Sequence, residues 1–167
     1  MKWDLNGAGV ISDFRKKNSF LSNFFEKPFI WKDRMFMNAE GAFQSEKSTD
    51  PAVQEKFTRM TPKEAKEAGR RLALRPDWES VKDEIMEEII YEKFSQNDSI
   101  LYKLIETGNA TLIEGNTWHD TYWGVDAFSG EGENKLGIIL MKVRARLIDE
   151  LGDAESIAEA MAEAAVS

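Results

Sequence analysis

The chain has 167 residues, of which 42% are hydrophobic and 11% aromatic, a composition typical of a globular domain that buries its own core. It has no cysteine and one histidine, which excludes a disulfide scaffold, a thiolate metal site, a cysteine nucleophile and a multi-histidine metal site. The net charge of −8 and the absence of a signal-like start or a long apolar run predict a soluble, cytoplasmic protein with no membrane span and no general nucleic-acid footprint.

Residues 9–36 have the pattern of strands and turns. Apolar residues flank the turn-like segment Lys32-Asp33-Arg34 on both sides, which predicts a hairpin. Asn38 is a good N-cap for a helix that runs to about Ser48. Asp50-Pro51 then opens another short helix.

The middle of the chain carries the strongest helix signals. Thr61-Pro62-Lys63-Glu64 is a capping box, and Gly69 is a plausible stop for the helix that it begins. A longer helix is expected from about Asp77 to Phe94. Its apolar residues recur at steps of three and four and therefore share one face: Trp78, Val81, Ile85 and Ile89.

Asn97 or Asp98 caps a short helix that ends near Gly108, and residues 110–114 resemble a strand. Residues 115–133 have a loop-like composition. Asn134 is then expected to cap the last long helix, whose apolar stripe is Leu136, Leu140, Val143 and Leu147.

These elements predict an α+β fold: a helix-rich single domain with a small antiparallel sheet, spanning residues 1–150. Residues 151–167 form an acidic, Ala/Glu-rich tail with good helix propensity. No βαβ alternation is present, so a doubly wound dinucleotide fold is not expected.

The helix after Asn38 is the first candidate for chemistry. Glu40, Phe43, Gln44 and Lys47 follow the spacing i, i+3, i+4, i+7 and share one face. One interpretation is an amphipathic surface helix with a polar ladder. The alternative is a pocket faced by a carboxylate, an amide and an amine.

The second candidate is the segment from Trp118 to Asp126, which combines three aromatic residues with one histidine and two aspartates. It is either a loop that covers the core, with Asp120 capping a turn, or a site for a flat heterocycle beside carboxylates. Glu114 could add another carboxylate. Trp78 is either core or a base-stacking residue at a pocket edge.

Several motifs, in this order, resemble one known family. They are Leu21-Ser22-Asn23-Phe24, Ala39-Glu40-Gly41-Ala42-Phe43-Gln44-Ser45-Glu46-Lys47, Arg75-Pro76-Asp77-Trp78, Leu112-Ile113-Glu114, Asp120-Thr121-Tyr122-Trp123-Gly124, and Gly132-Glu133-Asn134-Lys135-Leu136-Gly137 with Leu140-Met141 and Arg144. The chain is similar to the NADAR (YbiA-like) family from about Phe14 to Leu147.

The resemblance implies an N-glycosidase that hydrolyses the C–N bond of a ribose-phosphate N-glycoside. In one branch of the family the substrates are reactive early riboflavin-pathway intermediates. In another branch the enzyme removes ADP-ribose from guanine, so nucleic acid is expected only as a modified substrate. A non-catalytic ADP-ribose- or NAD-binding module is a third alternative. No cofactor and no metal are expected.

The chemistry of C–N cleavage and the resemblance together assign the residues. Glu40 and Lys47 are the predicted catalytic pair. The predicted substrate-binding residues are Asn23, Phe24, Gln44, Arg70, Arg75, Trp78, Glu114, Asp120, Trp123, Gly124, Asp126 and Asn134. The sequence departs from the family at Gly41, where a bulky residue, frequently histidine, is common, and the glycine is expected to open space in the pocket.

Overall fold

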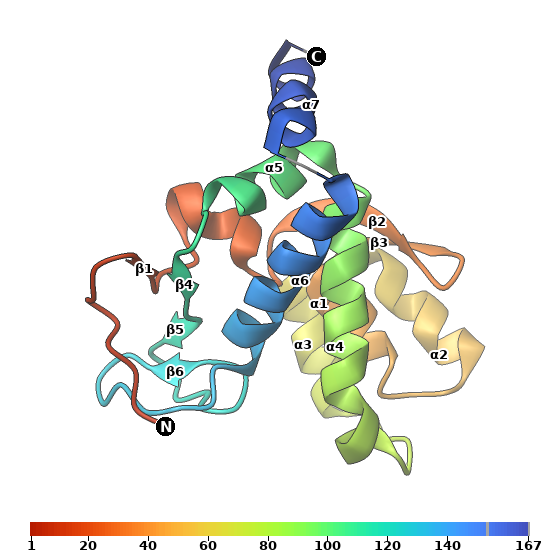
Figure 1. Cartoon of the computed structure of the whole chain (residues 1–167). Helices are drawn as coiled ribbons and strands as arrows, with labels where there is room; N and C mark the ends of the chain where they lie inside the picture. Colours follow the sequence, from red (N-terminus) through yellow and green to blue (C-terminus); the bar gives the residue numbers. More distant parts are fainter. Residues whose placement is uncertain (153, 167) are drawn as a thin grey trace. The chain divides into compact units, whose positions relative to one another are not determined.

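The chain groups into two units, which we describe separately (Figure 1). The computed structural model describes residues 1–152 and 154–166. The central unit is Ser19–Asn97, and the terminal unit combines Met1–Asn18 with Asp98–Ser167.

The central unit begins with the predicted hairpin. A 3₁₀ helix, η1 (Lys16–Leu21), leads into β2 (Glu26–Trp31) and β3 (Arg34–Asn38), which pair antiparallel. Lys32 and Asp33 both have positive φ, as a tight turn between twisted strands requires. The two faces alternate, with Phe29 and Phe36 buried opposite each other. The hairpin prediction is therefore confirmed.

Helices fill the rest of the central unit. They are α1 (Ala39–Ser45), α2 (Pro51–Lys56), the 3₁₀ helix η2 (Phe57–Arg59), α3 (Pro62–Arg70) and α4 (Trp78–Ser95). The predicted caps are confirmed: Asn38 Oδ1 accepts the Gly41 N–H at 2.7 Å, Asp50 caps α2, and the Thr61 capping box begins α3. The helix α1 ends earlier than Ser48, because Glu46 and Lys47 turn more tightly, with N–H bonds to carbonyls three residues back.

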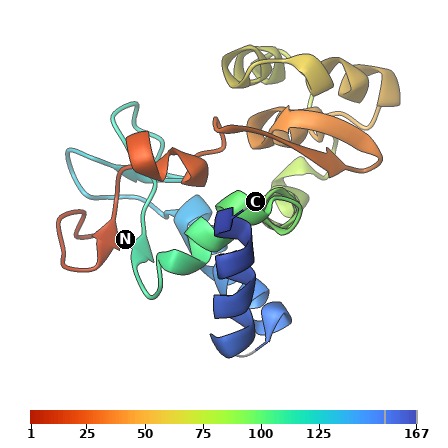
Figure 2. The ribbon, with the colours of Figure 1, turned by 90° about the horizontal axis from the view of Figure 1, so that it is seen from above.

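The buried helix α1 lies among its neighbours in this unit. It packs against α3 and α4, and α4 also packs along β2. Figure 2 shows α2 and α3 along one side of the hairpin. At the far end of α4, Gln96 forms hydrogen bonds with both the N–H and the carbonyl of Ile30 in β2. The hairpin is thus fixed to α4 by side-chain-to-backbone hydrogen bonds as well as by the packing of α4 along β2.

The terminal unit contains two small parallel sheets. β1 (Val10–Ile11) pairs with β4 (Thr111–Leu112), and β5 (Gly115–Asn116) pairs with β6 (Val125–Asp126). The α+β class is confirmed, but the expectation of one small antiparallel sheet is met by the hairpin alone. Strands of two residues carry no alternation from which their pairing could be predicted.

Helices complete the terminal unit: α5 (Asp98–Glu106), α6 (Lys135–Leu151) and α7 (Ala154–Val166). The last of these is the helix expected in the acidic tail. Within the described residues, no helix combines the length and apolarity needed to cross a membrane.

Asn134 precedes α6, as predicted, but its side chain does not cap the helix. Its Nδ2 donates to the Leu112 carbonyl and its Oδ1 accepts the Glu114 N–H. The capping prediction is wrong because Asn134 has a left-handed backbone (φ 53°), and its amide ties β4 to the start of α6 instead.

Gly69 lies inside α3 rather than after it, so the predicted stop is also wrong. A Cβ at this position would overlap the side-chain amide of Gln44 in α1. The glycine therefore permits the close approach of α3 to α1.

We expect Gly69→Ala to lower the free energy of unfolding by about 1–3 kcal/mol, because the added methyl displaces Gln44. The expected loss is opposite in sign to the gain in stability that alanine usually brings over glycine inside a helix. Urea denaturation measures the change, with Glu67→Ala on the exposed face of the same helix as control. An equal or higher stability for Gly69→Ala would contradict the close-packing role.

Candidate active site along α1

Glu40 lies in the first turn of α1, and its side chain is buried. Its N–H donates to the carbonyl of Asn23 at 3.1 Å, and its Oε1 accepts a hydrogen bond from Gln44 Nε2 at 2.8 Å. The N-terminal turn of a helix favours a carboxylate, because the free N–H groups carry partial positive charge. Local structure thus holds this acid in a fixed position away from bulk water.

Every residue of α1 is buried. The interpretation of this segment as an amphipathic surface helix is therefore wrong, since a helix that is buried all round belongs to the interior. A site faced by the polar residues of α1 stays a prediction.

Two buried amide oxygens beside Glu40 lack hydrogen-bond partners within the described chain: Asn23 Oδ1 and Gln44 Oε1. Both residues are less than one-tenth exposed. Buried acceptors without donors are rare and costly, and they often mark functional positions. Both oxygens are shielded from solvent, and Gln44 Oε1 faces Gly69 of α3.

Lys47 follows α1 in the turn beyond Ser45 and is half-buried. Burial lowers the pKa of its amine below the ordinary 10.5. Glu40 opposes this shift by favouring the charged form, whereas Arg70 and Lys82 reinforce it. The predicted acid and amine are therefore close enough to influence each other electrostatically, and the free amine is available at a lower pH than for an exposed lysine.

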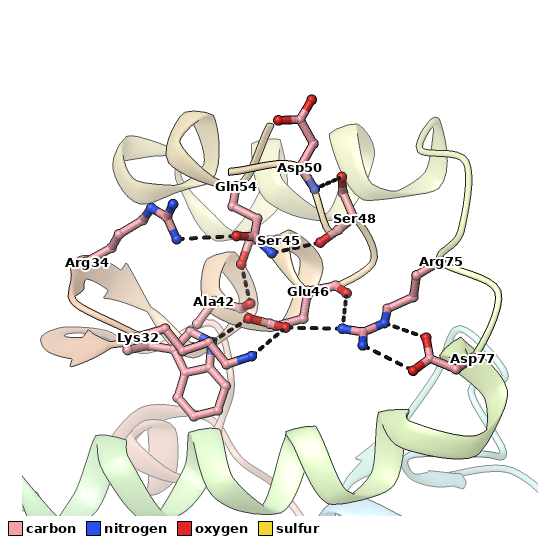
Figure 3. Close-up of polar contacts among 11 residues, drawn as sticks. Lys32, Arg34, Ala42, Ser45, Glu46, Ser48, Asp50, Gln54, Arg75 and Asp77 are labelled. Carbon is pink, nitrogen blue, oxygen red and sulfur yellow. Dashed lines mark hydrogen bonds and ion pairs between the residues drawn. The ribbon is translucent and has the colours of Figure 1, made fainter. Parts of the chain in front are cut away.

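The carboxylate next to Lys47 in sequence, Glu46, is the centre of a polar network (Figure 3). It is almost fully buried and accepts hydrogen bonds from Trp31 Nε1 at 3.0 Å and Lys32 Nζ at 3.1 Å. Arg75 Nη1 approaches the same carboxylate and the Glu46 carbonyl, each at 3.5 Å. This network joins the hairpin turn, the end of α1 and the segment before α4.

Arg75 is thus largely occupied by protein carboxylates. Its Nε and Nη2 bind Asp77 at 2.6 and 3.1 Å, and its N–H donates to the Lys47 carbonyl at 2.8 Å. We assign Arg75 to holding the backbone of Lys47. Arg70, by contrast, is exposed and forms no ion pair among the described residues.

The two aromatic residues of the central unit that were predicted to bind substrate, Trp78 and Phe24, differ in burial. Trp78 is 5% exposed, and its ring packs on Phe43 with centroids 5.1 Å apart, as the core interpretation expects. Phe24 is 43% exposed, and Lys66 Nζ lies 5.8 Å from its ring centroid. Base stacking by Trp78 stays a prediction.

Asp120 is one of the predicted binding residues in the terminal unit, and it organises a turn. Its Oδ1 accepts the N–H groups of Tyr122 and Trp123, at 3.1 and 3.0 Å. Trp123 is half-buried, with its ring edge-to-face against Tyr122. The turn-capping interpretation of Asp120 is therefore the one that the structure supports.

Asp126 organises the next turn. Its Oδ2 accepts from Ser129 Oγ at 2.8 Å, the largest cause of its lowered pKa, and His119 Nδ1 lies 3.2 Å from its Oδ1. Glu114 Oε2 accepts from Asn116 Nδ2 at 3.0 Å. Substrate contacts by Glu114, Asp120, Trp123 and Asp126 remain predictions.

Two glycines of the predicted motifs are packing positions. A Cβ on Gly124 would overlap the backbone carbonyl and side chain of Glu114. A Cβ on Gly41 would come within 3.1 Å of the Phe57 carbonyl and 3.2 Å of Asn38 Oδ1. The expectation that Gly41 opens space in a pocket is therefore wrong, because η2 and the helix cap already fill that space.

Among the described residues, no group of three or more His, Cys, Asp or Glu side chains is arranged to hold a metal ion. Sequence reasoning missed two buried charged residues of the central unit, Glu46 and Lys93. Both are charged and buried, and only their long-range partners distinguish them from surface residues.

Comparison with known proteins identifies the family. The NADAR domain model matches residues 10–148, most of the chain. The chain belongs to the NADAR domain family. A solved NMR structure of the E. coli protein YbiA superposes with a TM-score of 0.76 at 31% identity, covering 86% of this chain and 87% of that one.

Curated relatives in this family have functional names. N-glycosidase YbiA of Escherichia coli (strain K12) is 36% identical over 132 residues, 77% of this chain and 81% of that protein. Riboflavin biosynthesis protein VVA0006 of Vibrio vulnificus (strain YJ016) is 33% identical over 140 residues, 79% of this chain but 36% of that longer protein. These relatives support an N-glycosidase function, that of a hydrolase acting on N-glycosyl bonds in a small-molecule glycoside.

We expect Glu46→Gln to lower the free energy of unfolding by about 1–3 kcal/mol, because charged hydrogen bonds to Trp31, Lys32 and Arg75 are weakened together. Urea denaturation measures the loss. Glu55→Gln, which removes an exposed ion pair with Arg34, is the matched control and should change stability by less than about 1 kcal/mol. Equal effects of the two variants would show that the Glu46 network does not stabilise the fold.

Proposed function

We propose that this N-glycosidase cleaves the C–N bond of a ribose-phosphate N-glycoside, with Glu40 and Lys47 as its catalytic residues. The observation that carries the proposal is a buried carboxylate in the first turn of α1 within electrostatic range of a partly desolvated amine just beyond the C-terminal end of that helix. An amine whose pKa is lowered by burial, close to a buried carboxylate, is what acid–base and nucleophilic chemistry require.

Cleavage builds positive charge on the anomeric carbon as the bonding electron pair leaves with the nitrogen base. Glu40 stabilises that charge and orients a water, whose oxygen bonds to the anomeric carbon. One proton of that water is lost and one is gained by the departing nitrogen, so the reaction is balanced as hydrolysis. Gln44 keeps Glu40 in place through the 2.8 Å hydrogen bond.

Lys47 offers two routes. In the first it stays protonated, supports the ionised Glu40 and attracts the substrate phosphate. In the second its free amine attacks the anomeric carbon of a ring-opened sugar, the base departs, and water later hydrolyses the imine. The lowered pKa of Lys47 favours the second route, since an amine nucleophile must lose its proton.

The phosphate is assigned to Arg70, whose exposed guanidinium is near enough to lower the pKa of Lys47. Asn23 and Gln44 are assigned to the substrate side of Glu40, since the Asn23 carbonyl accepts the Glu40 N–H and Gln44 Nε2 donates to Glu40 Oε1.

The relatives named riboflavin biosynthesis proteins favour reactive early riboflavin-pathway intermediates as the substrate class. Removal of ADP-ribose from guanine is the alternative. Mass spectrometry after incubation with the pyrimidine intermediates, ADP-ribosylated guanosine and NAD distinguishes the two. Release of a free base from the first group only is the expected result, whereas tight binding without any turnover would indicate a non-catalytic module.

We expect Glu40→Gln to reduce kcat by about 10²-fold or more, because the amide keeps the shape but cannot neutralise the developing charge. Glu67→Gln, on the exposed face of α3, is the control. Steady-state kinetics on the substrate found by mass spectrometry provide the measurement. A kcat of Glu40→Gln within about threefold of the wild-type value would show that Glu40 is not the catalytic carboxylate.

The imine route predicts a substrate adduct that borohydride traps on Lys47 and that Lys47→Ala abolishes. The trapped fraction should rise with pH through the lowered pKa of Lys47. Arg70→Ala should move that rise to higher pH, because Arg70 lowers the pKa, whereas the adjacent, exposed Arg71→Ala should not. Turnover without any trapped adduct would assign the reaction to direct water attack.

A further inference from the structure

Lys93, near the end of α4, is buried completely, and no carboxylate among the described residues pairs with it. Its Nζ donates hydrogen bonds to two backbone carbonyls, Phe20 at 2.8 Å and Ser22 at 2.9 Å. Two aromatic rings also lie near the amine, with the ring centroids of Phe94 and Phe25 at 4.9 and 5.8 Å.

This placement is costly for the fold. Burial lowers the pKa of Lys93 from 10.5 to about 7. Between these values the unfolded chain holds more protons than the folded chain, so the contribution of Lys93 to stability decreases as pH falls. An apolar side chain of similar length would avoid this cost, which indicates that the amine serves the structure around it.

The segment that Lys93 holds leads directly to Glu40. Ser22, one of its acceptors, is followed by Asn23, and the Asn23 carbonyl accepts the Glu40 N–H. The Asn23 side chain is held by the same helix, since its Nδ2 contacts Met86 Sδ at 3.4 Å. Met86 and Lys93 are two turns apart and share one face of α4.

We propose that Lys93 is a positioning residue that fixes the Phe20–Asn23 segment, and through it the catalytic carboxylate Glu40 and the orphan oxygen of Asn23. The proposal rests on the function proposed above for its catalytic consequence, but the mechanical coupling from Lys93 to Glu40 is independent of any substrate. A hydrogen-bonded amine is suited to this task because it can bind two carbonyls of one turn at once.

The structural arm of the test follows amide hydrogen exchange at Glu40 by NMR. Lys93→Met removes both hydrogen bonds, and we expect exchange at Glu40 to become about tenfold faster than the change in global stability explains. Gln96→Ala is the matched control, because Gln96 lies on the same helix and also binds two backbone groups, but of Ile30. Gln96→Ala should change amide exchange at Glu40 only as much as its effect on global stability explains.

The kinetic arm separates positioning from general destabilisation. For the folded Lys93→Met enzyme we expect kcat to fall about ten- to hundredfold with KM within about threefold, since misplaced catalytic groups slow the chemical step. Lys93→Gln, which retains one donor group, should recover part of both readouts, and it replaces Lys93→Met if the latter does not fold.

Failure of the positioning role and failure of the proposed function give different results. If Glu40 exchange and kcat respond alike to the Lys93 variants and to Gln96→Ala, the positioning role is overturned while the glycosidase proposal stands. If the wild-type protein hydrolyses no N-glycoside, the proposed function fails, and the exchange arm still decides whether Lys93 positions Glu40.

Discussion

Removal of a carboxylate from water is the constraint on which the central unit depends. Glu40 is buried in the first turn of α1, so its position must be set by groups that compensate for lost hydration. Its backbone is held by Asn23, and its side chain by Gln44. Gln44 in turn requires a glycine on α3, because any side chain at position 69 would displace it. The buried position of Glu40 thus depends on three segments: the chain at Asn23, α1 itself through Gln44, and α3 through the glycine at position 69.

Charged residues around Glu40 divide into two groups according to their partners. Glu46 and Arg75 are paired with each other and with neighbouring polar groups, and their role is to join segments (Figure 3). Lys47 is half-buried, and its pKa is depressed mainly by burial. Arg75, which is bound by Glu46 and Asp77, therefore holds the backbone of Lys47. The amine of Lys47 itself remains within electrostatic range of Glu40.

Local signals allowed much of the fold to be predicted. The hairpin, the Asn38 cap, the capping box before α3 and the extent of α4 depend on residues within a few positions of one another, whereas the predicted stripe on α4 is only half buried, at Trp78 and Ile89. The contact between Glu40 and Gln44, four positions apart on α1, was predictable for the same reason. What the sequence could not show was that α1 is buried all round, which excludes the surface-ladder alternative.

The mispredicted or missed features depend on contacts between distant residues. Lys93 binds a carbonyl 73 residues away, and Glu46 binds an arginine 29 residues away, and neither spacing has a local signature. Asn134 was expected to cap its own helix, but it binds β4, 22 residues earlier. The parallel strand pairs, each of two residues, likewise form only when remote segments meet.

The contact between Gln96 and Ile30 has a consequence for solubility. A two-stranded hairpin offers unpaired backbone groups along its edges, and the outer face here exposes Ile30 and Met35. Such an edge can recruit a strand from another molecule and begin aggregation. Gln96 occupies both backbone groups of Ile30 with its amide, and Asn97 covers the Pro28 carbonyl. Two amide side chains at the end of one helix thus protect this edge from intermolecular pairing.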